Sequence, residues 1–262
     1  MTQRASRVGL NESRLVRLLS DLGVSDAAFP SGNLSQRLGG LIDFKASMRL
    51  ATFHDELRTL TFEPSPAPTA AQALKEEVLQ ARLSLMRMIV EGFVPGAGPA
   101  RLKLPTLAAD ISLDRLLEFE PYHRFYAAHQ RALDARIQTL QLRVREVLTG
   151  RSAELARLAA MDAAMRDIVS PHTRTSLAVI PQLLSRRFDA LVNAYRSTQA
   201  TPGDQEADLL PEEDKLKAWT RPDGWLGTFC HDMQQLLLAE LDLRLVPILG
   251  LVEAVDEEVM RK

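Results

Sequence analysis

Apolar residues fill almost every position of one stretch near the C-terminus. Between Leu236 and Val252 only Glu240, Asp242 and Arg244 are charged, and most of the other residues are leucine, valine or isoleucine. Apolar positions recur there at intervals of three and four, which is the helical period. A helix that is apolar around most of its circumference must be covered on several sides. The pattern predicts a buried C-terminal helix, with the three charged residues on its one solvent-exposed strip.

Pro247 lies inside this apolar stretch. A proline within a helix lacks the N–H that would bond to the carbonyl four residues earlier, here that of Leu243. Apolar residues keep helical spacing on both sides of it, so we expect a kink or a tight break, with the helix resuming. The stretch is too short and too charged for a membrane span, which takes roughly 20 mainly apolar residues.

Helical spacing also fills nearly every other segment, and no run of residues alternates with the period of a strand. The fold class predicted is all-α, an irregular multi-helix bundle around a buried, Pro-kinked C-terminal helix. Ser170-Pro171 is expected to stop one helix and start another, because proline disfavours helical angles in the residue before it. Start and stop residues predict helices over Asn11 to Gly23, Leu34 to Leu60, Thr69 to Val94, Pro121 to Gly150 and Ala153 to Val169, a brief turn after Ser112, and another helix after Pro181.

Proline-rich and glycine-rich segments suggest where the chain divides. Glu63 to Pro68 has proline at 64, 66 and 68, which predicts an extended linker. We expect an N-terminal helical segment over residues 1–62 and a main helical bundle over residues 63–262. Mobile joints are expected at 93–105 and at 198–214, since proline and glycine interrupt both. One continuous domain is the alternative.

Charge is nearly balanced along the chain. The net charge is −2 and the pI is near 6.2, so no overall field attracts nucleic acid or an anionic membrane. Between Pro121 and Arg157 the chain has seven arginines and three acidic residues. These arginines could bind RNA phosphate or the acidic joint of the same chain. A solvated helix face is the simpler interpretation. The balance argues against nucleic acid as the partner.

Cysteine content and the N-terminus bear on the compartment. Cys230 is the single cysteine, so no disulfide can form within the chain, which is typical of a reducing compartment. Residues 1–13 contain no apolar segment of the signal-peptide type. We therefore predict a cytoplasmic location, unless a partner carries the protein to a membrane.

Reactive residue types cluster once, at Cys230-His231-Asp232. Neighbours on a helix point about 100° apart, so these three side chains diverge, and Cys230 lies on the apolar face. The chain has no glycine-rich phosphate loop, no nucleophile elbow and no zinc-ligand spacing. We predict no catalytic residue, no metal and no cofactor. The alternative is an enzyme or small-ligand binder with a pocket made by Tyr122, His123, Tyr126 and His231.

Two leucine-rich stretches carry a family resemblance. The run from Leu237 to Ala254, with Pro247 and Gly250 inside it, resembles the C-terminus of an uncharacterised bacterial domain-of-unknown-function family. The run from Ser13 to Leu19 resembles the N-terminus of the same family, whose members are of similar length. The resemblance implies an accessory role beside stator-like and OmpA-like envelope proteins, whose genes lie near those of the family. It supplies no catalytic residues.

Apolar helix surface is the feature that points to a function. We predict a protein–protein interaction module or accessory subunit, and no enzyme, with a protein partner or a second copy covering one side of the C-terminal helix. A weak RNA-binding helix bundle is a further alternative to the ligand binder. The candidate interface residues are Met233, Leu237, Leu238, Leu241, Leu245 and Ile248.

Overall fold

The computed structural model describes residues 14–21, 48, 51–53, 57, 61–64, 71–94, 102–105, 112–199 and 211–261. Within these ranges every regular element is a helix, which confirms the all-α prediction. The helices are α1 (Arg14–Asp21), α4 (Ala71–Gly92), α5 (Leu113–Leu116), α6 (Glu120–Thr149), α7 (Ala153–Leu177), α8 (Ile180–Gln199), α10 (Glu212–Thr220) and α11 (Trp225–Arg261).

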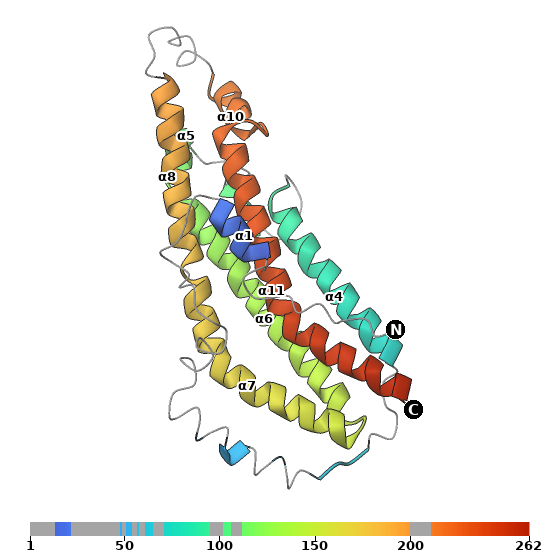
Figure 1. The fold of residues 1–262 in the computed structure, drawn as a ribbon. Coiled ribbons are helices and arrows are strands. Elements are labelled where there is room, and N and C mark those ends of the chain that lie inside the picture. The colour runs from blue at the N-terminus through green and yellow to red at the C-terminus, as the bar shows by residue number, and fades with distance from the viewer. Residues whose placement is uncertain are drawn as a thin grey trace, which may run out of the picture.

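Helix α11 is the central element of the bundle. α4 and α6 pack along it, and α1, α7, α8 and α10 also contact it (Figure 1). Leu226, Phe229, Leu237 and Leu241 of α11 have no exposed surface. Burying an apolar side chain of this size contributes about 1.5–3 kcal/mol. The prediction of a buried C-terminal helix is confirmed, and the elements that cover it belong to the same chain.

The helix α11 continues through Pro247. The predicted tight break is therefore absent, and the predicted kink stays a prediction. Pro247 lies on an exposed part of α11. Water can reach backbone groups on an exposed side, which lessens the cost of the hydrogen bond that proline cannot make.

Helices α6 and α7 begin and end with local sequence signals. Pro121 lies in the first turn of α6 and Gly150 directly follows its end, as predicted. The hydroxyl of Ser152 accepts a hydrogen bond of 3.2 Å from the Leu155 N–H and so caps α7. A cap of this kind stabilises a helix by about 1 kcal/mol.

The predicted stop at Ser170-Pro171 is wrong. α7 runs through Pro171 to Leu177, and the break comes between α7 and α8, where Pro181 lies in the first turn of α8. Proline removes one hydrogen bond from the helix, and neighbouring contacts can outweigh that loss. Thr175 donates its hydroxyl to the Pro171 carbonyl at 3.0 Å, which supports the helix on the far side of the proline.

The predicted joints lie partly outside the described residues. Of the joint at 198–214, residues 198–199 belong to α8 and residues 212–214 to α10. Of the joint at 93–105, the Leu104 N–H donates to the Gly92 carbonyl at 2.9 Å, which ties the 102–105 turn to the end of α4. The predicted helix over 34–60 and the linker over 63–68 are described only at scattered positions.

Aromatic rings collect where α8, α10 and α11 meet. Trp219 of α10 and Trp225 of α11 have ring centroids 5.5 Å apart, and Tyr195 of α8 lies 5.5 Å from Trp219. Phe188 of α8 packs on Phe229 of α11 at 5.1 Å. Such aromatic pairs contribute roughly 0.5–1.5 kcal/mol beyond the area they bury. They fasten α10 and α8 to the first half of α11.

Candidate functional site

A buried carboxylate lies in the centre of the bundle, on α11. Glu240 is 0% exposed, and its carboxylate accepts hydrogen bonds from the Tyr126 hydroxyl at 2.6 Å and from the Gln130 amide at 2.9 and 3.1 Å. Arg244, one turn along the helix, reaches it at 3.3 Å. The pair that the sequence placed on a solvent-exposed strip is thus internal, which corrects that prediction. Tyr126 and Gln130 are one turn apart on α6 and share one acceptor.

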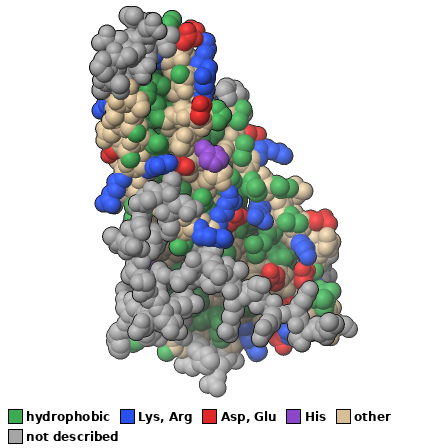
Figure 2. Space-filling model, turned by 45° about the horizontal axis from the view of Figure 1, so that its top comes forward, with side chains coloured by type: hydrophobic (Ala, Val, Ile, Leu, Met, Phe, Trp, Pro, Cys, Tyr) green, Lys and Arg blue, Asp and Glu red, His purple; other side chains and the backbone are tan. Residues whose placement is uncertain are grey.

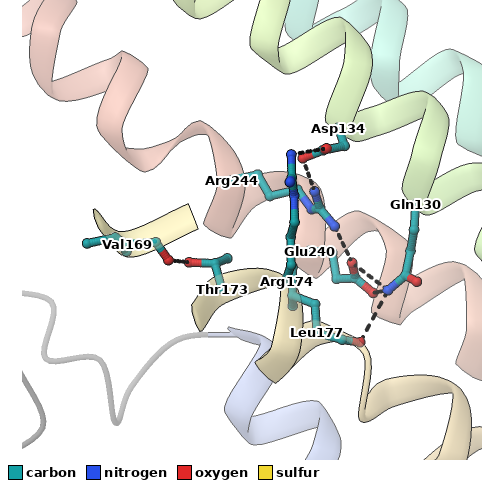
Figure 3. Close-up of polar contacts among 8 residues, drawn as sticks. All are labelled: Gln130, Asp134, Val169, Thr173, Arg174, Leu177, Glu240 and Arg244. Atoms are coloured by element: carbon teal, nitrogen blue, oxygen red, sulfur yellow. Dashed lines mark hydrogen bonds and ion pairs between the residues drawn. The ribbon is translucent and has the colours of Figure 1, made fainter. Parts of the chain in front are cut away.

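The cluster continues toward the surface through a second acid. Arg244 pairs with Asp134 of α6 at 3.1 Å, and Arg174 of α7 pairs with the same acid at 3.2 Å (Figure 3). Gln130 also donates to the Leu177 carbonyl at 3.4 Å, at the end of α7. α6, α7 and α11 are therefore joined by one polar network. We name Tyr126, Gln130, Asp134, Arg174, Glu240 and Arg244 the Glu240 cluster.

Burial sets the electrostatics of this cluster. It raises the pKa of the Glu240 carboxyl, against the lowering effect of the Tyr126 hydrogen bond and the Arg244 charge. Burial also raises the pKa of Tyr126 well above its ordinary value. A carboxylate and a phenol with no exposed surface offer a substrate no approach. We interpret the cluster as a buried polar network that fixes the axial register of α6 against α11, a role that such networks can have.

A buried histidine fixes the end of α4 against α6. His129 is fully buried, and its Nδ1 lies 3.1 Å from the Phe125 carbonyl. A Cβ at Gly92 would lie 2.7 Å from His129 Nε2 and 2.7 Å from the Leu102 carbonyl, so only glycine fits this contact. Burial lowers the pKa of His129. The neutral ring behaves as a core residue.

A groove with a volume of about 920 Å³ lies beside α10 and the first turns of α11. Cys230, on its α11 wall, is mostly covered, and burial raises the pKa of its thiol to about 12. A thiol that stays protonated at neutral pH is a poor nucleophile and a poor metal ligand. Its neighbour Asp232 instead pairs with Arg187 of α8 at 3.0 Å. Asp232 therefore points away from Cys230, as predicted, while Cys230 and His231 both line the groove.

The predicted pocket of aromatic and histidine residues does not form around the groove. His231 lines the groove, but the other three predicted residues do not. Tyr122 is buried and donates to the Leu116 carbonyl at 3.1 Å, and Tyr126 belongs to the Glu240 cluster. His123 is partly exposed and stacks on Phe119, with ring centroids 6.0 Å apart. Of the four predicted residues, only His231 therefore lines the groove.

The candidate interface residues on α11 lie in the core of the chain. Leu238 is half-buried, and the other five are essentially without exposed surface. They pack within the same core as residues of α1, α4, α6 and α8. In this structure the side chains of Met233, Leu237, Leu241, Leu245 and Ile248 are therefore not free for a partner.

Two ion pairs join α4 to the middle and to the C-terminal part of α11. Arg82 pairs with Asp242 at 2.9 Å, and Lys75 pairs with Asp256 at 3.0 Å. The residue numbers rise on one helix as they fall on the other, so the two helices are antiparallel neighbours, as Figure 1 also shows. Val246 lies between the two acids on α11 and is 59% exposed.

The side of α4 that faces away from the core is also apolar. Leu79, Leu83 and Val90 of α4, and Val94 two residues beyond its end, recur at intervals of four and seven residues and are 46%, 53%, 42% and 43% exposed. Figure 2 shows hydrophobic side chains among charged ones on the flank of the molecule that carries α4. We name these four residues, together with Val246, the outer face.

Among the described residues, no three histidine, cysteine, aspartate or glutamate side chains gather as a set of metal ligands. None of the helices in the described part of the chain combines the length and the apolar character that a membrane crossing requires.

Comparison with known proteins yields a family and no function. Neither a curated protein nor a solved structure matches the chain. A family model described as "Protein of unknown function (DUF3348)" matches residues 1–257, a range that contains almost every described helix in full. The resemblance to an uncharacterised family is confirmed, while the bacterial origin and the gene neighbours stay predictions. The chain belongs to the DUF3348 family of proteins of unknown function.

Proposed function

We propose that this protein is a helical interaction module, an accessory subunit that docks on a partner protein through the outer face of α4 and α11. The observation that carries the proposal is the exposure of Leu83, Leu79 and Val90 on the side of α4 opposite its buried side. This helix has two apolar faces and the chain covers one of them, so the second face is available to a partner. Contiguous exposed apolar residues rimmed by polar ones are typical of interaction sites.

The dimensions of the outer face suit a partner helix. From Leu79 to Val90 the face is about 17 Å long at the helical rise of roughly 1.5 Å per residue. Anchors at intervals of four and seven residues are those that an amphipathic helix uses when it packs in a groove. Val246 of α11 borders the same strip and would widen the contact.

The proposal includes the setting that the family resemblance implies. The protein would work without catalysis, in the cytoplasm, next to an envelope-associated complex. Support for the absence of catalysis is local: the Cys230 thiol stays protonated, and Glu240 and Tyr126 have no exposed surface. Cell fractionation followed by immunoblotting checks the location, since an envelope partner would hold part of the protein in the membrane fraction.

Site-specific photo-crosslinking tests the docking surface. A photoreactive amino acid replaces Leu83 in the full chain, expressed in its native cell, and Ser84 carries the same group as the matched control. Ser84 is exposed but points about 100° away from Leu83 around the helix. We expect a crosslinked partner band from position 83, absent from position 84, and lost when Leu79 is changed to Glu. Equal crosslinking at both positions would contradict the proposal, and so would none at position 83.

A further inference from the structure

We propose a second site, independent of the outer face: the groove beside α10 and α11 binds one small molecule with an apolar tail and a zwitterionic head. The groove is lined by α10, by the first turns of α11 and by Leu104 of the 102–105 turn. Its volume of about 920 Å³ lies within the range of about 300–1,000 Å³ that small-molecule pockets occupy. It shares no residue with the outer face.

The lining supplies a place for the tail. Phe93, Leu104, Leu216 and Pro222 contribute apolar surface. Phe93 is held edge-on against Phe125, with ring centroids 5.1 Å apart, so this wall is fixed before a ligand arrives. Cys230 adds a side chain that stays uncharged at neutral pH and therefore behaves as a small hydrophobe. An alkyl chain or a flat ring system can pack on this surface without leaving a charge unpaired.

The charged residues of the groove select the head. Glu213 and Lys217 lie one turn apart on α10 and both line the groove, while Gln234 on α11 adds an uncharged donor and acceptor. Lys217 donates to Asp214 at 3.2 Å, but both side chains are more than half exposed, so the pair is weak and can exchange partners. A ligand with a single charge is attracted by one of Glu213 and Lys217 and repelled by the other. A zwitterion meets a partner for each of its charges, which is the complementarity we infer.

Three probes with the same decyl chain test the choice of head on the full-length protein. They are decylphosphocholine, decanoate and decyltrimethylammonium, titrated calorimetrically below the concentrations at which they form micelles. We expect decylphosphocholine to bind about tenfold more tightly than either singly charged probe, because only its head group carries a partner for both Glu213 and Lys217. Absence of binding by all three overturns the proposal, and so does equal binding by all three.

Substitutions in the tail region establish where the probe binds. Leu216→Arg places a charge among the apolar lining residues and should weaken decylphosphocholine binding about tenfold or more. Leu142→Arg is the matched control, since Leu142 is 54% exposed on α6 and does not line the groove. Far-UV circular dichroism shows that both variants are folded. Equal binding by the two variants would place the probe elsewhere and overturn the assignment.

Substitutions of Glu213 and Lys217 are more informative, because they should change which of the three probes binds most tightly instead of only weakening binding. Glu213→Gln removes the acidic residue that lines the groove and keeps Lys217, so decanoate should become the tightest of the three probes. Lys217→Gln leaves Glu213 unopposed, so decyltrimethylammonium should gain instead. An unchanged order of affinities in both variants would show that these two residues do not read the head, which overturns the zwitterion assignment.

Cys230 reports occupancy directly, because it is the single thiol of the chain and lines the groove. Saturating decylphosphocholine should slow the reaction of Cys230 with a small aromatic disulfide about fivefold or more, because the bound probe covers the thiol.

Vesicles of phosphatidylcholine distinguish a free ligand from a membrane surface. Sedimentation of the protein with vesicles, without binding of monomeric decylphosphocholine, would overturn the proposal. Protection of Cys230 by the monomeric probe supports it.

Discussion

Helices α11 and α4 are both rich in apolar residues, yet they meet their surroundings in opposite ways. Other helices of the chain cover α11, and the cover is complete enough to enclose a carboxylate, Glu240. α4 buries one side and exposes leucine and valine on the other. The difference shows that apolar content does not by itself identify an interface. Whether an apolar side of a helix is available to a partner depends on whether other elements of the same chain already cover it.

The largest expected effect comes from placing a charge on each helix in turn. Leu237→Asp on α11 should remove most of the folding free energy, because an unpaired buried charge costs several kcal/mol against a total of about 5–15. Leu83→Asp on α4 should change it by about 0.5 kcal/mol or less, as is usual for exposed sites. Urea denaturation followed by circular dichroism measures both. Similar losses for the two variants would mean that the outer face is part of the core.

Leu245→Asp extends this test to another side of α11, because the sequence predicted that a partner covers one side of this helix. Because Leu245 is 1% exposed, we expect this variant to unfold as readily as Leu237→Asp. Light scattering accompanies the denaturation to report the oligomeric state. A stable Leu245→Asp variant that has lost an assembly would restore the sequence-based interpretation of α11.

Removal of the buried carboxylate should have the next largest effect. Glu240→Ala removes one of the two acids that pair with Arg244 and takes the acceptor from Tyr126 and Gln130, so it should destabilise the protein by about 3–5 kcal/mol. Asp256→Ala, which breaks the half-exposed pair with Lys75, is the control and should cost about 1 kcal/mol or less. Equal costs would show that the Glu240 cluster is no stronger than a surface pair.

The pH dependence of Glu240→Gln gives an independent check of the burial. The pKa of Glu240 is raised above its ordinary value of 4.5 in the folded protein. Its stabilising contribution is therefore complete below that value and is lost as the pH rises through the raised pKa. The glutamine variant has no such loss, so its stability relative to the wild type should increase from about pH 4.5 upward. A relative decrease would mean that Arg244 and Tyr126 outweigh burial.

A smaller effect compares one substitution on both helices. Gly92→Ala in α4 should destabilise the protein by about 1–3 kcal/mol, since its Cβ would press on His129 and on the Leu102 carbonyl. Thermal unfolding measures the change. A neutral result would mean that the 102–105 turn shifts away without cost.

Gly250→Ala in α11 should act in the opposite direction. Apart from the adjacent backbone of α11 itself, no heavy atom lies within 4 Å of a Cβ built there, and the residue is exposed within a helix. Alanine should stabilise the protein by about 0.4–1 kcal/mol through the reduced entropy of the unfolded chain. A loss of stability would indicate that a contact with a second molecule needs the bare backbone at this position.

Local signals made much of the fold predictable. Pro121 and Gly150 marked the ends of α6, because a first-turn proline and a glycine after the last turn act within one turn of the helix. Pro171 misled the prediction, because a proline within a helix removes only one hydrogen bond, and α7 continues past it to Leu177.

The Glu240 cluster could not be predicted in the same way. Its partners Tyr126 and Gln130 lie 114 and 110 residues earlier in the chain. The pattern read from the sequence, Glu240 followed by Arg244 one turn later, is equally typical of a solvent-exposed pair. One signal was present: the two residues lie within an otherwise apolar run. The outer face was missed because single exposed apolar residues are common on a protein surface, and the sequence alone does not show that several of them share one side of α4.

Trp219 and Trp225 are the two tryptophans of the chain, and their rings lie together where α10 meets α11. Intrinsic fluorescence of this protein is therefore a local signal from one end of the bundle. An unfolding curve recorded by tryptophan emission follows the detachment of α10, while circular dichroism follows the whole helical content. Midpoints that differ between the two optical signals would reveal that this end separates before the rest of the chain unfolds.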